Sequence, residues 1–354
     1  MKTLKRTLAL ATIGLAAVAT SAQAQTQTRP VVQFIATGGT IAMKIDPVTK
    51  GVVPAISGDD LMQTVPDAGK YATIEVNNFS AMSSNYIEAK WWTRLTKAVD
   101  DALARPEVAG VVIAHGTDTM EETAYWLDLT VKSDKPVILI GAQRNASSPD
   151  FDGPRNLLNA IRIATTPEAR GKGVMLAMNN QINAARNVTK THTANVETFN
   201  SGDFGFLGEV WDDKVVFTRA PLRRQHHDIG SAEMPRVEIV AMFGGADGSL
   251  MRYAVDQGAK GIVVQAVGMG NMNVSMFEAL KYALSKGVPV VVSTRVHNGR
   301  TRPVYGFVGG GKTSDEAGAV MAGDLSPQKA RLLLMLQLHR GVTGKAELQA
   351  AFDR

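Results

Sequence analysis

The sequence predicts an α/β protein of two domains. The larger N-terminal domain is expected to hold a doubly wound, mostly parallel sheet, and the smaller C-terminal domain a flavodoxin-like parallel sheet. Apolar runs rich in β-branched residues alternate with segments of helical spacing, which is the pattern of parallel sheets. Two of these runs end in glycine and threonine, and a polar segment over residues 219–235 interrupts the alternation. A chain of 354 residues is also too long for one small core.

Residues 1–24 have the features of a secretory signal peptide. A basic start is followed by an apolar core over residues 8–18 and by an A-x-A cleavage site at Ala22-Gln23-Ala24. This apolar core is too short for a membrane span, and no later run is long enough for one. We therefore expect a periplasmic protein with no membrane segment, whose mature chain starts at Gln25.

Charge and cysteine content exclude several functions. The formal net charge is +5, but the leader carries three positive charges, so about +2 remains on the mature chain, which argues little for nucleic-acid binding. The chain has no cysteine, which excludes disulfides, thiolate catalysis and cysteine-bound metal. A basic cluster at residues 223–227 has no aromatic residues within it, and its two histidines lack partners at metal-ligand spacing. We expect a solvated linker there, and no metal site.

The N-terminal domain is expected to span residues 29–218, with strands and helices in alternation. Its apolar, β-rich runs predict strands at residues 31–36, 108–114, 136–141 and 173–178. Helical spacing predicts helices at residues 89–103, 121–131 and 156–164.

A linker over residues 219–236 is expected to lead into a C-terminal domain over residues 237–354, where the alternation resumes. Strands are expected at residues 237–243, 261–267 and 288–293, and helices at residues 250–257 and 276–286. A last helix should begin at Pro327, with Ser326 as N-cap and the apolar residues 332–338 forming its buried face.

The first candidate site lies at the end of the strand expected over residues 31–36. The chain continues as Thr37-Gly38-Gly39-Thr40. Two glycines allow a sharp turn and a close approach to a ligand. The threonine hydroxyls stand at the carboxyl end of a parallel strand, where open α/β sheets bind ligands. The alternative is a tight turn that only joins strand to helix.

A second strand ends in a similar way, at residues 115–119. Thr119 is expected to cap the next helix in a capping box with Glu122. Thr117 and Asp118 are then left to face the crevice at the end of the sheet. A carboxylate there suits the ammonium group of a ligand, and free backbone N–H groups suit a carboxylate.

Lys190 is the third candidate. A lone lysine is commonly a solvated charge, but beside a hydroxyl in a partly buried site it can act as a base or electrostatic partner.

Residues 306–313 match G-x-x-x-x-G-K-[ST], the phosphate-binding loop. A phosphate-binding loop follows a strand and leads into a helix, whereas this segment follows a short stretch with a proline and precedes residues that form helices poorly. We therefore expect a mobile glycine-rich loop, and of the functions considered we rank nucleotide binding last.

The two strand-end motifs, residues 36–42 and 115–124, together resemble the signatures of bacterial type II L-asparaginases and glutaminase-asparaginases. Shorter matches occur at residues 127–130, 134–136, 141–144, 152–154, 188–191 and 327–331. The resemblance implies hydrolysis of the side-chain amide of L-asparagine, and of L-glutamine as a second substrate, by a homotetramer in which two subunits build each site. It implies no metal and no cofactor.

By this resemblance, Thr40 is the nucleophile that forms an acyl-enzyme with the substrate. Thr117, Asp118 and Lys190 are similar to the second catalytic group.

The resemblance also implies a substrate-binding role for five residues. Ser80 is expected to bind the α-carboxylate and Asp118 the α-amino group, with Gly39, Gly116 and Thr117 also lining the substrate. The backbone N–H at the Gly116-Thr117 turn is expected to hold the oxyanion.

Three features depart from the family pattern. The loop at residues 50–54 lacks the tyrosine that usually attends the nucleophile, and Tyr86 or Lys190 is the candidate to replace it. Ala81 stands where a glutamine is usual. Residues 244–247 and 297–300 hold no clear match to the asparagine and glutamate that reach the neighbouring site. The alternative is thus a non-catalytic periplasmic binding protein for acidic amino acids or their amides.

Overall fold

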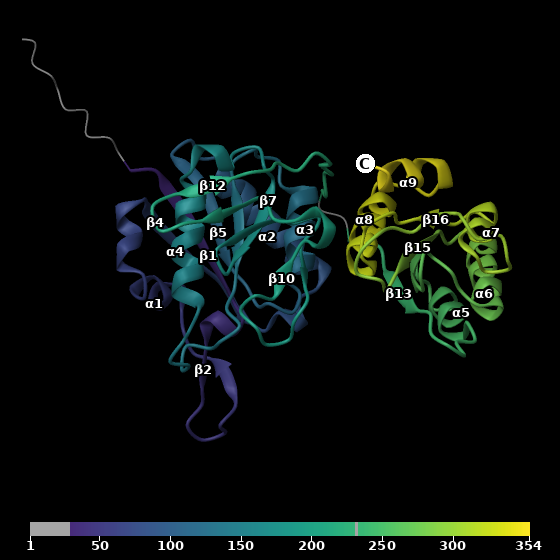
Figure 1. The fold of residues 1–354 in the computed structure, drawn as a ribbon, viewed down its shortest axis with the longest axis horizontal. Coiled ribbons are helices and arrows are strands. Elements are labelled where there is room, and N and C mark those ends of the chain that lie inside the picture. Colours follow the sequence, from purple (N-terminus) through teal and green to yellow (C-terminus); the bar gives the residue numbers. More distant parts are fainter. Residues whose placement is uncertain (1–28, 231–232) are drawn as a thin grey trace, which may run out of the picture.

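The computed structural model describes residues 29–230 and 233–354, which form two α/β units side by side (Figure 1). The expected signal peptide therefore lies outside the described residues. In the part of the chain that the structure describes, we find no helix with the length and apolarity to cross a membrane.

The N-terminal unit is built on an eight-stranded sheet with the order β12-β11-β8-β7-β6-β5-β1-β4. The five strands from β4 to β7 run parallel, whereas β8, β11 and β12 add in antiparallel fashion. The predicted mostly parallel sheet is confirmed. The strands are β1 Val31–Gly38, β4 Thr73–Met82, β5 Val108–Ala114, β6 Val137–Ile140, β7 Val174–Met178, β8 Gln181–Ala184, β11 Gly208–Val210 and β12 Val215–Phe217.

Helices cover both faces of this sheet, because its central strands are apolar on both sides. On β1, Val32 and Phe34 pack on one face with α1 and α4, and Ile35 packs on the other face with α2 and α3. This is the continuous apolar run expected of a fully buried parallel strand. The helices are α1 Gly58–Gln63, α2 Ala89–Leu103, α3 Met120–Thr130 and α4 Gly153–Ala164.

The C-terminal unit is a four-stranded parallel sheet whose order, β13-β14-β15-β16, follows the chain. The predicted smaller parallel sheet is confirmed. Helices α5 and α6 pack on one face and α8 on the other. The elements are β13 Val237–Ala241, α5 Ser249–Asp256, β14 Gly261–Ala266, α6 Val274–Ser285, β15 Val290–Thr294, α7 Gly311–Glu316, β16 Val320–Met321, α8 Pro327–His339 and α9 Lys345–Phe352.

Helix α8 joins the two units. It is apolar around most of its circumference, so it packs against the C-terminal sheet and against α3 at once, within one continuous core. Next to it, Asp324 accepts hydrogen bonds from Arg186, at 2.9 Å, and from Arg223 of the linker. The Arg186 and Asp324 side chains are 6% and 9% exposed. Burial raises the pKa of Asp324, but the hydrogen bonds and charges of the two arginines outweigh burial and leave the pKa lowered.

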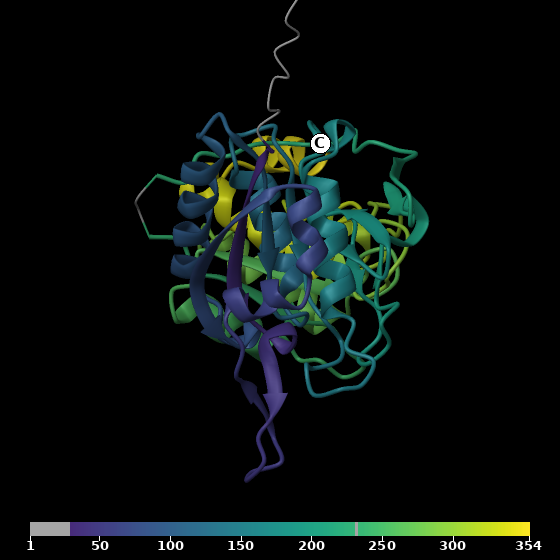
Figure 2. The same ribbon diagram turned by 90° about the vertical axis from the view of Figure 1, so that its left-hand side faces the viewer.

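Two small hairpins lie outside the main sheets. Strands β2 Met43–Ile45 and β3 Val52–Pro54 pair in a hairpin that projects from the body of the molecule in both views (Figures 1 and 2). Strands β9 Thr189–Lys190 and β10 Phe199–Asn200 form the other.

Most predicted elements are observed within a few residues of their expected bounds, but the sequence analysis missed the short strands β8, β11 and β12 and also the longer strand β4. It lies at the edge of the sheet, where half-buried and exposed residues replace a solid apolar run. The alternation of Ile74 and Val76 with polar residues was the signal that could have revealed it.

Candidate active site

The candidate residues gather where the strand order of the N-terminal sheet reverses. The chain leaves β1 to form β4 on one side, then crosses back to form β5 on the other side. The connections after β1 and β5 therefore lead to helices on opposite faces of the sheet, α1 and α3, and the carboxyl ends of two such strands are the usual ligand site of these sheets. Thr40 follows β1, and Thr117 and Asp118 follow β5.

Two glycines bring the strand-end motifs into direct contact. Gly39 has φ 82° and ψ 179°, a conformation that other residues rarely adopt. A Cβ atom on Gly39 would lie 2.2 Å from Cα of Gly116, so the two backbones touch. This contact places Thr40, at the start of a short 3-10 helix, beside the turn that carries Thr117.

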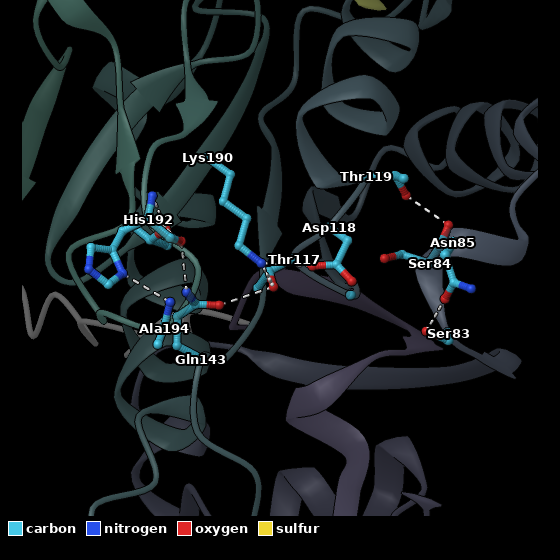
Figure 3. Close-up of polar contacts among 12 residues, drawn as sticks. Ser83, Ser84, Asn85, Thr117, Asp118, Thr119, Gln143, Lys190, His192 and Ala194 are labelled. Carbon is cyan, nitrogen blue, oxygen red and sulfur yellow. Dashed lines mark hydrogen bonds and ion pairs between the residues drawn. The ribbon is translucent and has the colours of Figure 1, made fainter. Parts of the chain in front are cut away.

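Lys190 reaches into the site from β9 and connects its polar groups (Figure 3). Its Nζ donates to Thr117 Oγ1 at 2.9 Å and to Asp118 Oδ1 at 2.8 Å. Thr117 in turn donates its hydroxyl proton to Oε1 of Gln143, at 3.1 Å. The structure thus brings Thr117, Asp118 and Lys190 together, as expected, and adds Gln143.

Burial differs sharply among these groups. Thr117 is 5% exposed, the Lys190 side chain 18%, and the Asp118 side chain 67%. An ion pair with so exposed a partner adds little to stability, about 0–1 kcal/mol. Asp118 and Lys190 also line an open cleft of about 400 Å³, so their carboxylate and ammonium groups are accessible to a small polar ligand.

Ser80 lies near the end of β4, next to β1, and its hydroxyl donates to the Thr37 carbonyl at 2.9 Å. This bond holds the serine at the same end of the sheet as the first motif. In this arrangement the Ser80 hydroxyl proton is donated to the protein backbone, and only the lone pairs of the Ser80 oxygen are free.

The capping box predicted for Thr119 and Glu122 is wrong. Thr119 is at the N-cap of α3, but its hydroxyl donates to the carbonyl of Ser84 at 2.8 Å and makes no cap bond. The bond to Ser84 orients the hydroxyl toward a distant segment, and its oxygen accepts no N–H from the first turn of α3. Glu122 instead lies 3.9 Å from Arg331 of α8.

A buried chain of hydrogen bonds orients the turn after β5. Trp92 donates to Thr123 Oγ1 at 2.8 Å, and Thr123 bonds His115 Nε2 at 2.9 Å. His115 Nδ1 lies 2.7 Å from the Gly116 carbonyl, which can only accept, so this nitrogen carries the proton. Burial lowers the pKa of His115 to about 4 and keeps it neutral. Because a peptide group is planar and trans, the N–H of Thr117 points away from His115.

Comparison with known proteins places this geometry in a family. The chain matches the family models "Asparaginase, N-terminal" over residues 31–223 and "Glutaminase/Asparaginase C-terminal domain" over residues 236–352. The chain belongs to the asparaginase family. This agrees with the resemblance that the two strand-end motifs carry.

Individual relatives of the asparaginase family cover nearly the whole chain. L-asparaginase 2 of Bacillus subtilis is 36% identical over 344 residues, which are 95% of this chain and 89% of the relative. A Haemophilus influenzae protein named "Probable L-asparaginase periplasmic" is 38% identical, covering 87% of this chain and 88% of its own. A crystal structure described as a probable cytoplasmic L-asparaginase from Campylobacter jejuni superposes with a TM-score of 0.84 at 37% identity, covering 92% and 100% of the two chains.

The departures from the asparaginase pattern have clear structural positions. Residues 50–54, which lack the tyrosine, end the exposed β2–β3 hairpin. Tyr86 is 71% exposed and lines a groove along α2 that holds none of the predicted site residues. Of the two candidate substitutes, Lys190 alone bonds to another site residue within the described chain.

The loop at residues 306–313 does not have the arrangement of a phosphate-binding loop. No strand directly precedes it in the described chain, and α7, which begins inside it at Gly311, has six residues. The Thr313 hydroxyl bonds the carbonyls of Phe307 and Gly310, at 2.9 and 3.0 Å. The N–H groups of Gly309, Gly310 and Gly311 donate to protein acceptors, so they are not free for phosphate. Residues 29–230 and 233–354 contain no group of three or more acidic or histidine side chains that could hold a metal ion.

Sequence reasoning missed two polar residues that complete the site. Gln143 follows β6, the strand beside β5, and this position at the same sheet edge was the available signal. Glu121 was assigned only to a helix, yet its carboxylate accepts the backbone N–H of Lys190 at 2.7 Å.

Proposed function

We propose that this protein hydrolyses the side-chain amide of L-asparagine to L-aspartate and ammonia, and that it accepts L-glutamine as a second substrate. The observation that carries the proposal is the placement of Lys190, whose Nζ bonds Thr117 and Asp118 where Gly39 touches Gly116. Membership of the asparaginase family and the names of the relatives support it.

Thr40 is proposed as the nucleophile. Its Oγ attacks the amide carbon, the C–N bond breaks, and the hydroxyl proton leaves with the nitrogen as ammonia. The resulting ester is hydrolysed by water, which restores the Thr40 hydroxyl and releases the carboxylate. The free N–H of Thr117, which donates to no acceptor among the described residues, is suited to the oxyanion of both steps.

Thr117 and Lys190 are proposed to move the protons. The Lys190 ammonium holds the Thr117 oxygen, and Gln143 accepts the Thr117 proton. Transfer needs the reverse direction at Lys190, so it starts from the neutral amine. The Thr117 hydroxyl then turns from Gln143 to give its proton to this amine and takes the proton of Thr40, and the same groups return a proton to the leaving nitrogen. In the absence of the loop tyrosine, this route takes its place.

The exposed Asp118 carboxylate is proposed to bind the substrate α-ammonium. Ser80 is proposed to bind the α-carboxylate by turning its hydroxyl proton from the Thr37 carbonyl to the ligand, together with nearby backbone N–H groups. No metal or cofactor enters either step. Because Ala81 stands in place of the usual glutamine, we expect the α-ammonium and α-carboxylate groups of the substrate to be bound less tightly than in other members of the family.

We further propose that the mature protein is an exported amidohydrolase that assembles as a homotetramer. Its leader supports export, and the name of the Haemophilus influenzae relative agrees. Large apolar side chains exposed on the C-terminal unit support assembly, among them Phe243, Leu250, Tyr253 and Phe307, each at least 52% exposed.

Ammonia release from L-asparagine and L-glutamine tests the activity. Thr40→Ala should abolish turnover while circular dichroism and melting temperature stay unchanged, and Thr40→Ser should retain part of it. Retained turnover in Thr40→Ala would remove Thr40 as nucleophile. Calorimetric binding of L-aspartate by the wild-type protein without turnover of either amide would identify a binding protein instead.

A further inference from the structure

The strand that carries Lys190 has little support from the main sheet. Strand β9 has two residues and, among the residues that the structure describes, pairs only with the two residues of β10. Both lie outside the eight-stranded sheet that positions Thr40 and Thr117. Contacts outside the main sheet must therefore fix the position of the Lys190 backbone, and with it the position of the side chain in the site.

Glu121 supplies one part of that support. Glu121 stands in the first turn of α3 and is 4% exposed. One carboxylate oxygen accepts the backbone N–H of Lys190 at 2.7 Å and the hydroxyl of Thr189. The other oxygen accepts the side-chain N–H of Gln328 at 2.8 Å. Glu121 therefore lies between β9 and the first turn of α8, and its second oxygen is set by the C-terminal unit.

Lys329, next along α8, supplies the other part. It is 2% exposed, and its Nζ donates to the carbonyl of Arg186 at 3.1 Å and to the carbonyl of Val188. These carbonyls stand four and two residues before Lys190. A buried ammonium with two fixed acceptors holds this backbone firmly, because moving it would leave the charge unpaired.

We propose that Gln328 and Lys329 are positioning residues for Lys190, so that the C-terminal unit sets the catalytic geometry of its own subunit. This rests on the proposed function, in which Lys190 acts on Thr117. Both residues bond to the segment that carries Lys190 or to the carboxylate that holds it. Gln328 borders the cleft that Asp118 and Lys190 line, but its side chain bonds Glu121 and neither of these two. A displacement of about 1 Å at this backbone would break the bonds to Thr117 and Asp118, and such a displacement costs about a hundredfold in rate.

A purely structural role has to be separated from a positioning role. The two units are already joined by the core around α8 and by the arginines on Asp324. Loss of the Gln328 bond alone should therefore leave the fold intact. Lys329→Met would leave two buried carbonyls without donors and threaten folding, so the test uses Gln328.

The decisive comparison uses Gln328→Glu, which sets a second carboxylate against Glu121. It should lower kcat for L-asparagine about ten- to a hundredfold and leave KM within about twofold. The double variant, in which Gln328→Glu is combined with Glu121→Gln, exchanges the two side chains and so restores a hydrogen bond between an amide and a carboxylate. The new amide at position 121 can donate to the new carboxylate at position 328, while the amide oxygen still accepts from Lys190. The double variant should regain most of the lost kcat.

Gln349→Glu is the matched control. Gln349 is also in the C-terminal unit and also bonds a carboxylate, that of Asp353 at 3.0 Å, but all its bonds stay within that unit. Its kcat should equal that of the wild type. An unchanged kcat in Gln328→Glu, an equal loss in Gln349→Glu, or a double variant no better than the single one would each overturn the proposal.

A second readout does not depend on turnover. The rate at which an amine-acetylating reagent modifies Lys190, followed by peptide mass spectrometry, should rise in Gln328→Glu and stay unchanged in Gln349→Glu. An inactive wild-type protein would refute the proposed function, yet the acetylation rates would still report on the positioning of Lys190. Equal rates at Lys190 in all variants would overturn the positioning role.

Discussion

The contact between Gly39 and Gly116 makes Gly39→Ala a severe test of how the two halves of the site are aligned. The new Cβ would lie 2.2 Å from Gly116 Cα and 2.3 Å from Gly116 N, whereas ordinary contacts begin at 3.4 Å. Both neighbours are backbone atoms, so no side chain can rotate away. The two motifs must separate by about 1 Å, and such a misplacement costs about a hundredfold in rate.

The backbone conformation of Gly39 adds to the effect on stability. Its φ of 82° with ψ of 179° is nearly restricted to glycine, and holding alanine there costs about 1–3 kcal/mol. Each kcal/mol lowers the melting temperature of a unit of about 200 residues, the size of the N-terminal unit, by about 2–4 °C. We therefore expect Gly39→Ala to melt several degrees below the wild type, and still to fold.

Steady-state ammonia release from L-asparagine and a thermal melt measure the two effects. Gly69→Ala is the control, because a methyl group added to Gly69 would meet no atom within 4 Å and the residue has no positive φ. A Gly39→Ala protein that keeps more than half of the wild-type kcat/KM would refute the claim that this backbone contact aligns Thr40 with Thr117.

Three further predictions concern stability and ligand binding. Asp324→Asn should lower the free energy of unfolding, measured in urea, by about 3–5 kcal/mol, because it leaves the buried Arg186 guanidinium without its counter-ion. His115, with its pKa lowered to about 4, binds fewer protons in the folded than in the unfolded protein between pH 4 and pH 6.5. Its contribution to stability is therefore complete above pH 6.5 and is lost as the pH falls to 4, so the wild type should lose about 3 kcal/mol more over this range than His115→Gln. ATP with Mg²⁺ should leave the melting temperature unchanged, because the N–H groups and the Thr313 hydroxyl of the 306–313 loop are already bonded within the protein.

Each of these has an outcome that contradicts it. A loss below about 1 kcal/mol in Asp324→Asn would show that the ion pairs with Arg186 and Arg223 are not needed to hold the two units. Parallel pH profiles for the wild type and His115→Gln would show that this histidine does not couple to folding. A clear stabilisation by ATP would restore the nucleotide-binding hypothesis.

The parts of the fold predicted from sequence are those with strong local patterns. Strands β5, β6 and β7 are continuous apolar runs, and α2 has helical spacing throughout its length, so each was placed to within a residue or two. Strand β4 was missed because an edge strand is half exposed. The hydroxyl of Thr119 was misassigned because its partner, Ser84, is distant in the sequence.

The sequence by itself determined the two strand-end motifs, and with them the candidates Thr40, Thr117 and Asp118, whereas Lys190 was a candidate outside both motifs. Glycine and threonine after an apolar strand are a local signal, and parallel strands bring their carboxyl ends to one edge. Only the tertiary structure decided what holds Lys190 in place. Glu121 and Lys329 lie far from Lys190 in the sequence, and no periodicity encodes which buried donor meets which acceptor once distant segments have packed.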